Sequence, residues 1–188
     1  LLAYAAWTHD CDAPLAPAHA VAAAGAAVKL FDPKFALKCA GSLSPTDPEW
    51  TEGQLQKSAA YLQLGLPLQA MAALDDVSEA QLGALGAESY AELIAAKADC
   101  MSWLPGRTGE VPELLRQARS RLHELAGELP AGSPQALTRA GLCLDLCEFN
   151  YLSFVGDYAP MMDRLSAAAS PDVDDVDPVH RLRSAIIL

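Results

Sequence analysis

The residues best suited to chemistry lie near the N-terminus, in the segment THDCD. This segment brings together His9, Asp10, Cys11 and Asp12, which are all metal-ligand types. A zinc site would need a second pair of ligands at a defined spacing, and the chain has neither a CxxC nor an HxxxH motif. A turn between two helices, with Asp12 as a cap shortly before Pro14, explains the same residues. We favour the turn, and a metal near His9 and Cys11 is the alternative.

A second candidate is the pair Cys143 and Cys147. A spacing of four places both thiols on one face of a helix, where they could bind a soft metal or form a redox pair. No His or Lys stands near them in the sequence to stabilise a thiolate, so we expect both to pack as small apolar side chains. The other three cysteines are scattered, and an odd set without a disulfide framework predicts a reducing, cytoplasmic location.

The remaining motifs for chemistry are incomplete. Residues 172–178, DVDDVDP, lack the central glycine and closing glutamate of a calcium loop, so we expect an acidic linker at about residues 170–178. The segment GRTGE, residues 106–110, has no Lys-Ser or Lys-Thr after its glycines and is not a phosphate loop. There is no GxSxG motif, and the four histidines lie far apart. We predict no catalysis and no cofactor in this segment.

Charge and hydropathy exclude two classes of partner. The formal net charge of the 188 residues is −11, whereas a nucleic-acid surface needs clustered Lys and Arg. The densest basic group, Arg116, Arg119 and Arg121, has acids nearby and is expected to be a solvated helix face. The uncharged stretch at residues 13–28 is rich in Ala and interrupted by Pro17, so we predict no membrane span there.

The two ends of the chain are apolar. It begins with LLAYAAW and ends with RSAIIL, and apolar ends on a complete protein would leave unburied surface. We therefore expect residues 1–188 to form one helical domain that is a piece of a larger protein.

Residue periodicity favours helices throughout. Val and Ile are sparse, alternation never persists, and Ala and Leu carry the apolar content. In residues 111–129 apolar side chains recur at steps of three and four, and Pro112 stands in the first turn. Breakers separate further helices near residues 35–43, 88–103 and 134–154. The pattern predicts an all-α fold of about nine helices or partial helices, joined by short turns as antiparallel hairpins.

The segment YLQLGLPLQAMAAL, residues 61–74, decides how the helices connect. Gly65 and Pro67 interrupt its apolar run and would cost about 1 and 3 kcal/mol inside a helix. We therefore predict two helices that turn back on each other at this point, with Ala59 and Ala70 allowing a close approach.

This hairpin resembles a tetratricopeptide unit. The family's order of aromatic, turn glycine, small, large apolar and small apolar residue is kept by Tyr61, Gly65, Ala70, Leu74 and Val77. A second, partial copy has Gly156, Leu165 and Ala168, although Leu152 replaces the aromatic residue and Met161 the small one. A weaker third copy ends at Asp32–Pro33. The two glycines are not separated by a multiple of the family's period of about 34 residues, so the repeats are degenerate.

The resemblance implies a right-handed α-solenoid whose first helices line a concave, partner-binding side. Transferred to this chain, that side would include Glu52, Leu55, Gln63, Leu146, Asn150 and Ser153. It would bind a protein segment, a peptide or a small effector, and the chain would contact neither nucleic acid nor membrane. Ala-rich arrays of this kind are similar to the helical regions of bacterial LuxR-type regulators, which implies a module of a larger transcriptional regulator. The alternatives are a ligand- or metal-binding helical domain and a structural or oligomerisation spacer.

Overall fold

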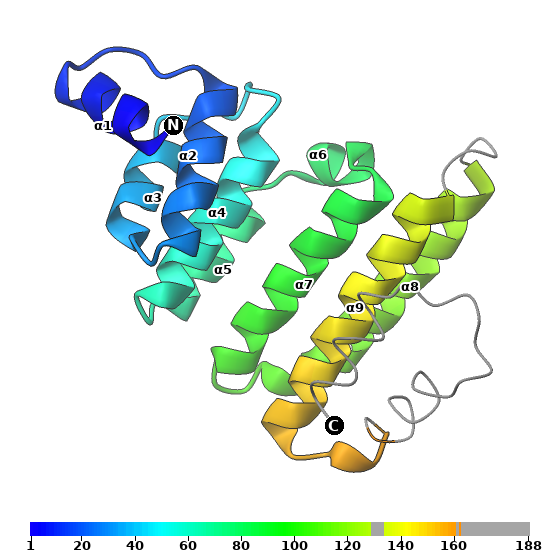
Figure 1. Ribbon diagram of the computed structural model, residues 1–188. Coiled ribbons are helices and arrows are strands. Elements are labelled where there is room, and N and C mark those ends of the chain that lie inside the picture. Colours follow the sequence, from blue (N-terminus) through cyan, green and yellow to red (C-terminus); the bar gives the residue numbers. More distant parts are fainter. Residues whose placement is uncertain (129–133, 161, 163–188) are drawn as a thin grey trace, which may run out of the picture.

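The structure, a computed structural model, describes residues 1–128, 134–160 and 162. Within these residues all regular structure is helical and there is no strand, which confirms the all-α prediction (Figure 1). None of the described helices combines the length and the apolar character that a bilayer span requires. The helices are α1 (Leu2–Asp10), α2 (Pro17–Lys29), α3 (Pro33–Ala40), α4 (Trp50–Gln63), α5 (Pro67–Asp75), α6 (Glu79–Ala84), α7 (Ala87–Trp103), η1 (Thr108–Glu110), α8 (Val111–Glu128) and α9 (Pro134–Val155).

Prolines set the starts of several helices. Pro17, Pro33 and Pro67 are the first residues of α2, α3 and α5, where the missing N–H has no intrahelical partner to lose. At α3 a side chain adds a cap, because the Asp32 carboxylate accepts a hydrogen bond of 3.1 Å from the Phe35 backbone N–H. These starts follow directly from residue types in the sequence.

Four helices end in the same pair of backbone hydrogen bonds. After α4, the Gly65 N–H donates to the Leu62 carbonyl and the Leu66 N–H to the Tyr61 carbonyl, each at 2.9 Å. Gly65 has φ of +71°, and this Schellman motif satisfies the last carbonyls while it reverses the chain. The predicted break is confirmed, since α4 and α5 are separate helices packed against each other. The equivalent positive φ after α1, α2 and α9 belongs to Asp12, Phe31 and Gly156.

The helices contact one another in a regular order. Helices α2, α4, α7 and α9 contact in succession along the chain. Helix α3 contacts both α2 and α4, α5 contacts both α4 and α7, and α8 contacts both α7 and α9. Figure 1 shows α7 between the α4–α5 pair on one side and the α8–α9 pair on the other. Helix α7 therefore joins the N-terminal and C-terminal helices of the described chain.

The core changes character along the chain. Helix α2 packs through Ala20, Ala23, Ala24 and Ala27, which are at most 1% exposed, and such small side chains allow helices to approach closely. From α5 onward one large cluster of Leu, Ile, Val, Met and Ala side chains joins α5, α7, α8 and α9. The composition reflects both parts, since Ala dominates the first and larger apolar residues the second.

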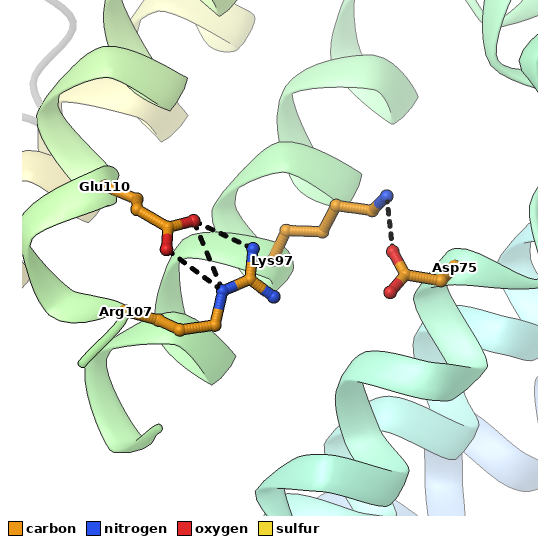
Figure 2. Close-up of polar contacts among 4 residues, drawn as sticks. All are labelled: Asp75, Lys97, Arg107 and Glu110. Atoms are coloured by element: carbon orange, nitrogen blue, oxygen red, sulfur yellow. Dashed lines mark hydrogen bonds and ion pairs between the residues drawn. The ribbon is translucent and has the colours of Figure 1, made fainter. Parts of the chain in front are cut away.

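A polar link accompanies the apolar contact between α5 and α7. Lys97 Nζ lies 3.0 Å from Asp75 Oδ1, and Arg107 Nη2 lies 2.9 Å from Glu110 Oε2 in the turn after α7 (Figure 2). The Asp75 and Glu110 carboxylates are more than half exposed, and exposed pairs contribute about 0–1 kcal/mol each. The α5–α7 contact therefore depends mainly on the apolar cluster, with the Lys97–Asp75 pair at its edge.

The hairpin positions predicted from the sequence are placed as follows. Ala70 and Leu74 are fully buried, Tyr61 is partly buried against the large cluster, and Gly65 and Gly156 occupy the two turns. Leu165, Ala168 and the predicted acidic linker at residues 170–178 lie outside the described residues.

We expect Gly65→Ala to lower the free energy of unfolding by about 1 kcal/mol. An added Cβ would meet no atom within 4 Å, so the cost comes from the positive φ alone. The matched control is Gly141→Ala inside α9, where an added Cβ also meets nothing within 4 Å. Because its backbone is helical, we expect a gain of about 0.5–1 kcal/mol. Urea unfolding followed by circular dichroism measures both, and changes of the same sign would contradict the assigned turn.

Candidate functional site

Helix α7 buries two sides and leaves a third side open. Ala91, Ile94 and Ala98 recur at steps of three and four and are buried on one side, and Leu93 and Cys100 are buried seven residues apart on another. The remaining stripe carries mostly acidic and aromatic side chains: Glu88, Glu92, Ala95, Asp99 and Trp103.

Glu92 faces other carboxylates. The Glu92 side chain is exposed, yet the protein around it excludes enough solvent to raise the pKa of Glu92, and the charges of Glu52 on α4 and Glu88 one turn away raise it further. The charge of Glu52 acts on Glu92 from α4, a helix that contacts α7. Glu88 has a cation nearby, since Arg139 Nη1 of α9 lies 3.7 Å from its Oε1. Glu52 and Glu92 have no ion pair with any residue that the structure describes.

Asp99 extends this face toward α9. Its side chain is exposed, yet the protein around it excludes enough solvent to raise the pKa of Asp99. On α9, burial raises the pKa of the Cys143 thiol, and the charges of Glu92 and Asp99 raise it further. The carboxylates therefore border α9 as well as α4. We name the acidic face by its four residues: Glu52, Glu88, Glu92 and Asp99.

An exposed aromatic pair lies beyond Asp99. Trp103 is 63% exposed and Phe154 is 50% exposed, and their rings meet edge to face with centroids 5.5 Å apart. Trp103 follows Asp99 by one turn of α7, and Phe154 follows Asn150 by one turn of α9. Large aromatic side chains exposed next to polar groups are typical of binding surfaces.

The three residues predicted on the earlier helix lie on α4 in different environments. Glu52 is exposed and belongs to the acidic face. Leu55 is half-buried and packs against the large apolar cluster. Gln63 is exposed but is held within the fold, because its Nε2 donates a hydrogen bond of 2.8 Å to the Val28 carbonyl of α2.

The three residues predicted on the later helix lie on α9. Leu146 is half-buried, whereas Asn150 and Ser153 are exposed. The Ser153 carbonyl accepts hydrogen bonds from the Gly156 N–H at 3.3 Å and from the Tyr158 hydroxyl at 3.5 Å. Helix α7 lies between α4 and α9 in the order of contacts. The three predicted residues on α4 are therefore separated by α7 from the three on α9.

The sequence prediction missed the middle of this face. It named no residue of α7, although Glu88, Glu92, Asp99 and Trp103 have spacings of four, seven and four residues, which place them on one helical stripe. That spacing was the available signal. Comparison with known proteins adds no relative, since no family model, curated protein or solved structure matches the chain.

The two cysteine-containing candidates have structural roles in the described chain. At the N-terminus, Asp12 has φ of +50° in the turn after α1, which confirms a turn there, and the His9 ring packs edge to face on Phe35 with centroids 6.2 Å apart. Within the described residues, no three His, Cys, Asp or Glu side chains converge as a metal site would require. Cys147 is buried against α7, with its thiol 3.8 Å from the Ala95 carbonyl, which confirms the predicted packing for this cysteine, whereas Cys143 is only half-buried.

We expect thiol reactivity to separate the cysteines. Burial, followed by the nearby Asp99 charge, raises the pKa of Cys147 to about 12, so almost no thiolate forms at neutral pH, whereas Cys11 is exposed. Iodoacetamide added to the folded protein should label Cys11 within minutes, and Cys39, Cys100 and Cys147 only after unfolding in urea. Peptide mass spectrometry locates the label, and rapid labelling of Cys147 in the folded protein would contradict its assigned burial.

We expect Glu92→Gln to stabilise the fold near pH 7. A carboxyl whose pKa is raised on folding opposes folding when ionised, so its unfavourable effect is complete above the raised pKa and absent below the ordinary value of 4.5. The gain from Glu92→Gln should therefore shrink as the pH falls toward about 4. The control is Glu113→Gln on α8, where hydrogen bonds from Arg116 and Gln117 lower the pKa of Glu113 to about 2. Glu113→Gln should lower the urea concentration at the midpoint of unfolding near pH 7, because it removes a stabilising carboxylate. If Glu92→Gln lowered this midpoint as well, the unfavourable surroundings assigned to Glu92 would be contradicted.

Proposed function

We propose that this chain is a tetratricopeptide-like interaction module that binds a positively charged segment of a partner protein on its acidic face. The observation that carries the proposal is the unpaired state of Glu52 and Glu92, on neighbouring helices, within the described chain. Carboxylates that lack a paired cation, as Glu52 and Glu92 do within the described chain, favour a cationic partner and repel anionic ones. The exposed Trp103 and Phe154 rings at the end of the face would contact apolar or cationic side chains of the same segment.

The order of helix contacts supports a stack of hairpins, and the family resemblance implies that this stack is right-handed. In such a stack each first helix packs on the next first helix, and each second helix lies between two first helices. Helices α2, α4, α7 and α9 follow the first pattern, and α3, α5 and α8 follow the second. The acidic face belongs to α4 and α7, which are first helices in this arrangement and would line its concave side.

The parent that we propose is a larger regulatory protein of the cytoplasm, with bacterial LuxR-type transcriptional regulators preferred. Support for this parent comes from the resemblance of the Ala-rich, degenerate hairpins. In such a parent the module would sense a partner or effector and pass the signal to another domain, and it would perform no catalysis itself.

A second candidate function is self-association through the N-terminal helices. Trp7, Leu30 and Phe31 are 63%, 68% and 80% exposed, and exposed apolar side chains of this size favour protein contacts. Light scattering over a range of concentrations tests it, because a strict monomer would exclude this role and a stable dimer broken by Phe31→Ser would support it.

The acidic face is tested with a fluorescein-labelled peptide rich in Lys and Leu. We expect saturable binding that weakens with added salt, and Glu92→Lys/Asp99→Lys should weaken it about tenfold or more. The control is Glu113→Lys/Glu124→Lys on α8, which changes the net charge equally at residues outside the acidic face. Fluorescence anisotropy measures the affinities, and equal losses in both double variants would mean that only the net charge matters.

A further inference from the structure

A pocket lies between α3, α4 and α5, apart from the acidic face. Its volume is about 370 Å³, which suits a small molecule. Helix α4 contributes Gln54, Lys57 and Tyr61 at steps of three and four, and α5 contributes Gln69. Asp76 borders the pocket directly after α5. Positions 54, 57 and 61 lie on the opposite side of α4 from positions 52 and 63.

Gln54 is a buried amide without a partner. It is 0% exposed, and neither its Oε1 nor its Nε2 makes a hydrogen bond within the described chain. A buried amide that gives up its hydrogen bonds to water without replacing them destabilises the fold. The amide atoms have no accessible surface in this conformation, so a bound molecule would reach them only after the Gln54 side chain turns toward the pocket that it lines. A ligand that offers both a donor and an acceptor would then supply the missing bonds.

The pocket also carries one cation and one anion that do not form a close pair. Lys57 stacks over the Trp50 ring, with Nζ 4.9 Å from the ring centroid. It has no ion pair within the described residues, although the Asp76 charge acts on it. Burial lowers the pKa of Lys57 and the charge of Asp76 opposes this change, as expected for an ammonium that has lost solvent. A carboxylate beside Lys57 would replace that solvent.

The geometry points to a binding site for a free amino acid with a carboxamide side chain. Its carboxylate would pair with Lys57, its ammonium group with Asp76, and its amide with Gln54. The Tyr61 hydroxyl and the Gln69 amide are further hydrogen-bonding groups at the pocket, and Leu37 provides an apolar wall. A zwitterion matches the two opposite charges, and the amide distinguishes this ligand from an apolar amino acid of similar size. This inference does not depend on the proposed function, because the pocket and the acidic face use different residues.

The test is a calorimetric titration of the intact chain with L-glutamine, L-leucine and glutaramate. L-Leucine lacks the amide and glutaramate lacks the ammonium group, so each should bind about tenfold or more weakly than L-glutamine. Absence of L-glutamine binding up to about 10 mM, or equal binding of L-leucine, would overturn the assignment.

Two variants assign the contacts. Lys57→Met should weaken L-glutamine binding about tenfold or more, because a charge-assisted bond is lost. The control Lys34→Met removes an equal charge from an exposed position on α3 and should leave the affinity unchanged.

Gln54→Leu should raise the melting temperature of the free protein and remove the preference for L-glutamine over L-leucine. The melting temperature shows that this variant folds, and a preference that survives the substitution would refute the role of Gln54. The peptide titration of the acidic face should be unchanged in all three variants, so the two proposals fail or succeed separately.

Discussion

A Schellman turn, which reverses the chain directly after a helix, requires one residue to accept a left-handed backbone. In this chain that requirement recurs after α1, α2, α4 and α9, where the same pair of hydrogen bonds ends each helix. Gly65 and Gly156 adopt φ of +71° and +78° without steric cost, whereas Asp12 and Phe31 adopt 50° and 57° at some cost. The reversals after α2 and α4 place α2 beside α3 and α4 beside α5, so the apolar faces of these short helices can be buried together.

Alanine determines how closely the reversed helices pack. Ala60 of α4 and Ala70 of α5 are fully buried, as are Ala20, Ala23 and Ala24 of α2. Close packing of small side chains leaves little room for rearrangement inside a hairpin. The proposed acidic face lies on two helices of different pairs, α4 and α7, whereas the pocket lies over the α4–α5 hairpin itself, with α3 at its side.

The sequence predicted the features that depend on local chemistry. Gly65 and Pro67 marked the reversal between α4 and α5, and periodicity identified the helices. Phe31 carries no signal for a left-handed backbone, because its type disfavours that conformation. The pocket lined by Gln54 could not be predicted, because α3, α4 and α5 form it together and the sequence of no single one of these helices indicates it. Glu92 and Asp99 had a readable spacing, but their lack of cations depends on which helices stand beside α7.

The distribution of unfavourable groups argues that both surfaces have roles beyond stability. On α8 two acids are paired: Arg116 lowers the pKa of Glu113, and Glu124 Oε2 lies 3.1 Å from Arg121 Nη1. The Glu92 carboxylate of α7 has no such partner within the described chain, and burial raises its pKa. Gln54 is buried with both amide atoms unpaired, although an apolar residue of similar size would fit a buried position better. The unpaired Glu92 carboxylate and the unpaired Gln54 amide each lower the stability of the free fold. A ligand that binds to these groups would restore that stability, which is the simplest explanation for keeping them.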